Sequence, residues 1–331
     1  MATCADPGDD LSREQQAHRG MPRAVVFTPS PLLTVTIEER PDRSPETHLH
    51  AGGQGVWIAR LMARLSVEVR LCGPFGGEIG AVLPTLVDRE GIGVCRSPLV
   101  ADNGSYVHDR RGGERRVITS TPPPPLARHQ LDELYNIALV EGLESDVAVL
   151  AGPDGEHVLP ADTYRRAASD LVSGGVPAVA DLSGDYLTAA AAGGITVLKV
   201  SHEDLIDDGR AQSDDPAELM RAMEALAREG AKTVIVSRAG EPALVLADGR
   251  FAEVRMPTFE GEDHRGAGDS MTGGVAAGLA RGDDLPQALR LGAAAGALNS
   301  TRHGLATGDG TQIERLARKV DVRPAEGSSV P

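Results

Sequence analysis

The chain has 331 residues, of which 41% are hydrophobic but only 3% aromatic, and its formal net charge at pH 7 is −15. This length suffices for one large α/β domain or two smaller ones, with a core built mainly from Ala, Val, Leu and Ile. The excess of 48 acidic over 33 basic residues argues against a general binder of nucleic acid or anionic membranes, but is compatible with a local basic pocket for a phosphate.

The two ends of the chain differ from its body. Residues 1–21 are polar and acidic and lack the apolar stretch of a secretory signal, so we expect a disordered tail there and a second one over residues 321–331. No apolar run approaches the roughly 20 residues of a membrane-spanning helix. The three cysteines are widely spaced, which argues against a disulfide framework or zinc site. We therefore expect one domain over residues 22–320 and a cytoplasmic protein.

Short β-rich segments alternate with helical patterns along this body. The strand candidates cover residues 24–28, 67–71, 147–150, 176–180, 195–200 and 233–237. Apolar spacings of three and four residues predict a helix around Ile58, Leu61 and Leu65 and another over residues 217–229. The later strands are continuously apolar, as expected when both faces are covered. The alternation predicts a mostly parallel sheet between two layers of helices.

One group of segments breaks the alternation. Residues 105–107 and 115–119 have the pattern of two short strands joined by a turn, and residues 35–39 and 47–50 have the pattern of edge strands. A small β lid over a cleft, drawn from about residues 30–50 and 102–121, is one interpretation. Ordinary surface hairpins are the alternative.

Three small residues and a carboxylate mark the point where a loop becomes a helix near the C-terminal end. Gly266, Ala267 and Gly268 let backbone N–H groups approach a ligand closely, and the helix adds its positive N-terminal end. This arrangement suits a phosphate in transit. Asp269, at the same point, suits the removal of a proton from a substrate hydroxyl during phosphoryl transfer. The alternative is a glycine-rich loop whose only role is close packing.

Several motifs occur in the order found in the PfkB (ribokinase-like) family of small-molecule kinases, which the chain resembles over about residues 23–320. They are AGGQGVWIA (51–59), GPFGGEIG (73–80), DLSG (181–184), LKVSHEDL (198–205), IVS (235–237) and DHRGAGDS (263–270). Within the family, FTPSPLLT (27–34) most resembles the opening motif of the 1-phosphofructokinase and tagatose-6-phosphate kinase branch.

The resemblance implies a ribokinase-like α/β fold, a three-layer α/β/α sandwich with a mostly parallel central sheet and a small β lid. It implies ATP as phosphoryl donor, Mg²⁺ as cofactor and a small-molecule hydroxyl as acceptor. In this interpretation Asp269 is the catalytic base and Gly266, Ala267 and Gly268 form the anion hole.

The resemblance also suggests residues for the nucleotide and the metal. The expected cofactor-binding residues are Lys199, Ser237, Gly240, Gly268 and Asn299. The family's Asn-x-x-Glu motif falls on residues 201–204, where Asp204 is expected to reach Mg²⁺ through water. The alternatives are a carboxylate at a helix start for Asp204 and a charge at a strand end for Lys199.

The acceptor site departs from the family pattern. The expected substrate residues are Thr34, Gly52, Gly53, Gln54, Tyr106 and Asp269. Gln54 occupies the position of a family lysine, and residues 102–106 align with a basic stretch of the family's lid, so that Asp102 and Tyr106 supply no positive charge there. Each lost charge-assisted bond to a phosphate removes about 1.5 to 3 kcal/mol. We therefore expect an acceptor other than fructose 1-phosphate, fructose 6-phosphate or tagatose 6-phosphate, unless the arginines of residues 110–116 bind a phosphate instead.

Two functions follow from these observations. The first is an ATP-dependent kinase acting on a sugar or other small alcohol. The second is a non-catalytic nucleotide-binding or sugar-binding regulatory homologue, favoured by the substituted acceptor positions and by the altered loop after Ser237. Neither nucleic acid nor a membrane is an expected partner, and open lid edges make a homodimer through the lid a further expectation.

Overall fold

We analysed a computed structural model of the chain, which describes residues 20–112, 115–155, 157–256, 266–300, 306 and 308–325. No helix within these ranges is long and apolar enough to cross a membrane.

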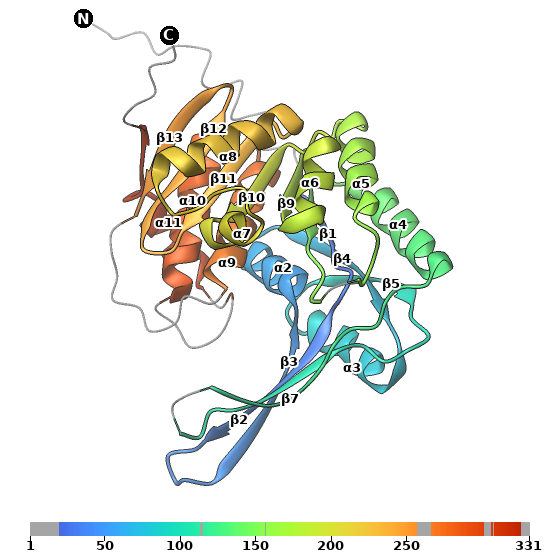
Figure 1. Cartoon of the computed structure of the whole chain (residues 1–331). Helices are drawn as coiled ribbons and strands as arrows, with labels where there is room; N and C mark the ends of the chain where they lie inside the picture. Colours follow the sequence, from blue (N-terminus) through green and yellow to red (C-terminus); the bar gives the residue numbers. More distant parts are fainter. Residues whose placement is uncertain are drawn as a thin grey trace, which may run out of the picture.

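A single ten-stranded sheet forms the centre of the molecule (Figure 1). From one edge to the other its strands are β14 (Asp321–Pro324), β13 (Arg250–Arg255), β12 (Glu241–Ala247), β11 (Thr233–Arg238), β10 (Val197–Ser201), β9 (Ala178–Asp181), β8 (Val147–Ala151), β1 (Arg23–Phe27), β4 (Glu68–Phe75) and β5 (Gly93–Pro98). The seven strands from β11 to β5 run parallel, and β12, β13 and β14 extend the sheet antiparallel.

Helices cover both faces of this sheet. One face carries α2 (Gln54–Arg64), α3 (Gly77–Asp88), α9 (Ala267–Ala280), α10 (Leu285–Ser300) and α11 (Gly310–Ala317). The other carries α4 (Arg128–Leu143), α5 (Asp162–Ser173), α6 (Gly184–Ala192), α7 (His202–Asp207) and α8 (Pro216–Glu229). Alternate residues of each central strand enter opposite cores, as Val26 does on one side and Val25 and Phe27 on the other. This is why the strands read as continuous apolar runs.

A second, four-stranded sheet projects from the body as a lid (Figure 1). Its order is β3 (Pro45–Gly52), β2 (Leu32–Glu39), β6 (Ser105–Asp109) and β7 (Arg116–Thr121). Asn103 fastens the lid to the body, because its side chain accepts the Gly76 N–H and donates to the carbonyls of Pro31 and Pro74 at 2.9 to 3.0 Å.

The connections between strands create a crevice at one end of the sheet. From β1 the chain runs outward through β4 to β5, and then returns to place β8 on the other side of β1. Where connections diverge in this way, the carboxyl ends of the two strands leave an opening that α/β proteins use for ligands.

The three-layer sandwich with its parallel sheet and lid confirms the predicted fold. The C-terminal boundary differs from the expectation, because residues 321–324 form β14 and pair with β13 instead of belonging to a tail. Residues 1–19 and 326–331, the remainder of the two expected tails, lie outside the described residues.

Candidate active site

Two pockets open at the carboxyl ends of the parallel strands. The lid-side pocket, of about 950 Å³, lies below the lid and is lined by Gln54, Trp57, Tyr106 and the segments that follow β8 and β9. The hairpin-side pocket, of about 530 Å³, is lined by the turn between β11 and β12, by the start of α9 and by α10. Asp181 lines the first pocket and Lys199 the second, so the two pockets adjoin at this pair of residues.

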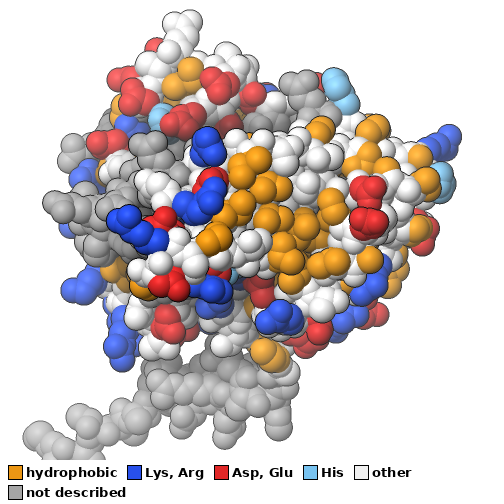
Figure 2. All heavy atoms as spheres, turned by 90° about the horizontal axis from the view of Figure 1, so that it is seen from below, with side chains coloured by type: hydrophobic (Ala, Val, Ile, Leu, Met, Phe, Trp, Pro, Cys, Tyr) orange, Lys and Arg blue, Asp and Glu red, His pale blue; other side chains and the backbone are white. Residues whose placement is uncertain are grey.

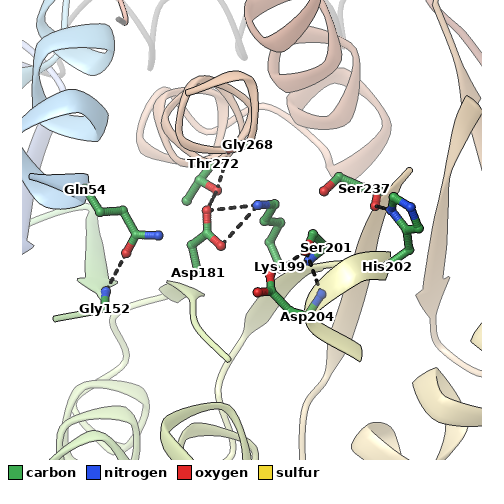
Figure 3. Close-up of polar contacts among 10 residues, drawn as sticks. All are labelled: Gln54, Gly152, Asp181, Lys199, Ser201, His202, Asp204, Ser237, Gly268 and Thr272. Atoms are coloured by element: carbon green, nitrogen blue, oxygen red, sulfur yellow. Dashed lines mark hydrogen bonds and ion pairs between the residues drawn. The ribbon is translucent and has the colours of Figure 1, made fainter. Parts of the chain in front are cut away.

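A buried ion pair separates the two pockets (Figure 3). The Lys199 Nζ atom lies 3.1 Å from each carboxylate oxygen of Asp181, and both residues are 5% exposed. The Thr272 hydroxyl donates to Asp181 Oδ2 at 2.8 Å and lies 3.0 Å from the Gly268 carbonyl oxygen. Burial disfavours the charged form of Lys199, but Asp181, Asp269 and Asp204 outweigh it and raise its pKa. The lysine is therefore a fixed positive charge at this point.

Asp269 lies in the first turn of α9, beside this ion pair. Its removal from water and the negative charge of Asp181 raise its pKa to about 7, although Lys199 and a hydrogen bond with the Gln54 side chain act in the opposite direction. A carboxylate with this proton affinity is matched to general-base catalysis near neutral pH.

Gln54 connects Asp269 to the segment that follows β8 at the lid-side pocket. Its Oε1 atom accepts the N–H of Gly152, the residue that follows β8 (Figure 3). Since that bond fixes the amide orientation, the Nε2 atom is the group that donates to Asp269. Gln54 therefore orients the Asp269 carboxylate without bringing a charge.

The turn before α9 is built for close approach. Gly266 has a φ of 71°, a left-handed conformation that favours glycine. A Cβ atom on Gly268 would lie 2.6 Å from Lys199 Nζ, so a side chain here would displace the lysine ammonium from its present position. Lys199, Ala267 and Gly268 thus line the hairpin-side pocket together. The first N–H groups of a helix have no partner within the helix, so the start of α9 and the Lys199 ammonium group both suit a negatively charged ligand there.

Asp204 is bound at the start of α7. Its carboxylate accepts the Ser201 hydroxyl, and Ser201 Oγ in turn accepts the Asp204 N–H at 3.0 Å (Figure 3). This reciprocal cap corresponds to the alternative interpretation of the residue. No cluster of three or more His, Cys, Asp or Glu side chains suited to a metal occurs within the described ranges. Because Mg²⁺ in kinases is held by one or two carboxylates, by water and by substrate phosphates, Asp204 at the rim of the lid-side pocket still fits that role.

The structure does not place all the expected substrate residues in the lid-side pocket. Gly53, Gln54 and Tyr106 line it, whereas Asp269 lies beside the Asp181–Lys199 pair and lines neither pocket. Thr34 of β2 and Gly52 of β3 do not line the lid-side pocket, and lie close together on these paired strands, where a Cβ atom on Gly52 would lie 2.6 Å from Thr34 Oγ1. These two residues therefore shape the base of the lid.

The prediction that Asp102 lies at the acceptor site was wrong. Its carboxylate accepts the Glu78 N–H at 2.9 Å at the start of α3, and it does not line the pocket. The Asp102 side chain thus provides a partner for an N–H group in the first turn of α3 that has none within the helix.

The expected nucleotide residues fall mostly together. Lys199, Ser237, Gly240 and Gly268 all line the hairpin-side pocket. Asn299 is buried instead, where its side-chain oxygen accepts the Ala306 N–H at 2.8 Å, and it is not part of the lining. Asp263, the first residue of the C-terminal motif, lies outside the described residues.

Three site residues had no role in the sequence interpretation. Asp181 enters the sequence interpretation only as part of the motif at residues 181–184. Thr272, which binds Asp181, and Asp154, which lines the lid-side pocket, have no predicted role. An aspartate at the carboxyl end of a continuously apolar strand is the signal that points to Asp181, because such strand ends meet at the ligand crevice. Nothing local marks Thr272, since its partner Asp181 is 91 positions away.

Comparison with known proteins identifies the family. The family described as pfkB family carbohydrate kinase matches residues 30–311. An ATP-dependent 6-phosphofructokinase isozyme 2 of Mycobacterium tuberculosis is 29% identical over 312 residues, which cover 90% of this chain and 89% of the relative. A 1-phosphofructokinase of Bacillus subtilis is 28% identical over 86% of this chain and 93% of its own length.

Solved structures show the same fold. Phosphofructokinase-2 from Escherichia coli in complex with potassium superposes with a TM-score of 0.77 at 23% identity, over 90% of this chain and 99% of its own. A possible 1-phosphofructokinase from Thermotoga maritima gives a TM-score of 0.79 at 16% identity, over 92% and 100%. The chain belongs to the pfkB family of carbohydrate kinases.

Proposed function

We propose that this kinase transfers the γ-phosphate of ATP to a hydroxyl of a sugar or other small alcohol, with Asp269 as the catalytic base. The observation that carries the proposal is the position of Asp269, a carboxylate of raised pKa in the first turn of α9, beside the Asp181–Lys199 pair at which the two pockets adjoin. The name of the M. tuberculosis relative, an ATP-dependent enzyme, supports ATP as the donor.

The acceptor is bound in the lid-side pocket and the nucleotide in the hairpin-side pocket. Asp269 takes the proton of the attacking hydroxyl, while the N–H groups of Gly266, Ala267 and Gly268 stabilise the negative charge of the group in transit. Lys199, held by Asp181, adds a positive charge beside Gly268. Such positioning and charge stabilisation account for most of the catalysis in phosphoryl transfer.

Asp204 is the residue that would hold Mg²⁺, through water. When bound, the ion would neutralise negative charge on the phosphates of the nucleotide. Ser237 and Gly240 would contact the nucleotide from the turn between β11 and β12.

We also propose a homodimer formed through the lid. Leu49, Val117 and Ile118 of the lid are 49 to 57% exposed, and every residue of β7 is exposed. Figure 2, which views the molecule from the side where the lid lies, shows apolar side chains gathered on this face. One relative, phosphofructokinase-2 of E. coli, is known in a tetrameric form.

The direct test is ATP consumption with and without Mg²⁺ against free sugars, sugar phosphates and nucleosides, with the product identified by mass spectrometry. We expect one acceptor class to gain a phosphate only when Mg²⁺ is present. If no phosphate is transferred to any of these alcohols in the presence of ATP and Mg²⁺, the proposal is contradicted.

A further inference from the structure

The lid-side pocket is acidic. Its described lining contains no lysine or arginine, and it contains four aspartates: Asp154, Asp181, Asp185 and Asp204. One histidine, His157, is the basic side chain among these lining residues. Lys199 lies next to the pocket, but its charge is matched by Asp181 at 3.1 Å.

One helix N-terminus at this pocket, that of α6, is already occupied by carboxylates of the chain. The N-terminal end of α6 faces the pocket, and the Gly184 N–H donates to Asp208 Oδ2 at 2.6 Å. Asp185 occupies the first turn of the same helix. A phosphate arriving at this end of α6 would meet two negative charges, those of Asp185 and Asp208.

The lid arginines do not compensate for this. Arg111 binds Asp109 at 2.8 Å, Arg116 lies 3.5 Å from the same carboxylate, and Arg115 contacts His108 at 2.5 Å. None of the three lines the lid-side pocket.

The lining matches a polyhydroxy compound instead. Carboxylates accept hydrogen bonds from hydroxyl groups, and Asp185 is exposed at the pocket. Trp57, Tyr106 and Tyr186 offer aromatic surfaces to the C–H faces of a sugar ring. Tyr106 is held in place by its hydroxyl, which donates to Asp154 Oδ2 at 2.7 Å.

We propose that the acceptor carries no phosphate or other anionic group, and that it is a free sugar or related uncharged polyol. This inference rests on the proposed kinase function and separates this chain from its relatives that are named phosphofructokinases. The acidic pocket repels a phosphate group on the acceptor, and its carboxylates also accept hydrogen bonds from the hydroxyl groups of the acceptor.

The test compares each free compound with its own phosphate ester as acceptor: fructose with fructose 1-phosphate and fructose 6-phosphate, and ribose with ribose 5-phosphate. We expect kcat/KM for the best free compound to exceed that of its ester by about tenfold or more, the loss typical of a missing charge-assisted contact. A higher kcat/KM for an ester in the best-used pair would overturn the inference and leave the kinase function intact.

Absence of turnover in every pair would count against the proposed function, and the inference is then decided by binding. Calorimetric titration of each pair in the presence of a non-hydrolysable ATP analogue and Mg²⁺ is the readout. Tighter binding of the free compound supports the inference, whereas tighter binding of the ester, or no binding of either, overturns it.

A charge-reversal variant makes the test independent of any one sugar. Asp185→Lys, at an exposed pocket position, is expected to raise the ester-to-free ratio of kcat/KM by about tenfold. Glu133→Lys, on the exposed side of α4 and away from both pockets, makes the same change in net charge and is expected to leave the ratio unaltered. Equal ratios in the two variants would show that pocket charge does not select the acceptor.

Discussion

Asp269 shares its surroundings with one further carboxylate and one lysine. Burial and Asp181 favour its neutral form, and Lys199 and Gln54 favour its ionised form. The first two effects prevail, so the pKa of Asp269 rises to about 7. A base is active only when ionised, which makes the rate of transfer depend on pH in the neutral range.

We therefore expect kcat/KM to rise with pH through an inflection near 7 and then to level off. Gln54→Lys places a cation beside Asp269, favours its ionised form and should move the inflection to lower pH. The measurement is a pH profile of kcat/KM for both proteins. An inflection in the variant at or above that of the wild type would contradict the assignment of Asp269 as the titrating base.

The Asp181–Lys199 pair gives a prediction about stability. Lys199→Met leaves a buried carboxylate without its cation, which should lower the free energy of unfolding by about 3 to 5 kcal/mol. Arg165→Met removes an exposed pair with Asp162 and should change it by less than about 1 kcal/mol. Urea denaturation of both variants is the measurement, and equal losses would contradict a structural role for the buried pair.

The sequence predicts the residues that carry the chemistry better than it predicts their partners. The sequence predicts roles for Asp269 and residues 266–268 because small residues before a helix start are typical of anion-binding turns, and these roles stay predictions. Asp204 and Asn299 were assigned by motif or position. The Asp204 carboxylate also accepts bonds from Ser201, and the Asn299 side-chain oxygen accepts the Ala306 N–H, away from the hairpin-side pocket. Contacts between distant segments, such as Thr272 with Asp181, depend on the fold and leave no local pattern.

The helix that follows the base packs closely against its neighbour. A Cβ atom on Gly274 of α9 would lie 2.6 Å from the Gly292 Cα atom of α10. Since the obstacle is backbone, a side chain at position 274 would require one of the two helices to move.

Gly274→Ala should therefore lower the free energy of unfolding by roughly 1 to 3 kcal/mol, despite the better helix propensity of alanine. Gly112→Ala is the matched control, because no atom lies within 4 Å of its Cβ position. Thermal unfolding distinguishes them. An unchanged or higher Tm for Gly274→Ala would contradict the packing described for α9 and α10.

Six strands of the central sheet (β1, β4, β8, β9, β10 and β11) and helices α2 and α8 were predicted from their apolar patterns. Strand β14 was not, because Asp321–Pro324 is short and polar and owes its existence to pairing with β13. The same reason applies to Asp102, whose role at α3 arises from a contact 24 positions away. Pairing of this kind is decided by neighbours in space, which local patterns do not encode.

The lid exposes apolar side chains on a molecule of net charge −15, where general repulsion between copies opposes association. A specific lid contact is the feature that would overcome it. Val117→Lys with Ile118→Lys should shift the protein toward monomer in sedimentation velocity experiments. Val140→Lys, at a 61% exposed position on α4, is the control. Identical distributions for wild type and both variants would contradict assembly through the lid.

The central claim is that Asp269 removes the proton during phosphoryl transfer. The most direct measurement is single-turnover transfer from ATP by Asp269→Asn beside the wild type, with nucleotide binding followed by calorimetry. We predict a loss of rate of about a thousandfold with nucleotide affinity nearly unchanged, because asparagine keeps the size of the side chain but accepts no proton at neutral pH. Transfer by Asp269→Asn at a rate close to that of the wild type would contradict the account.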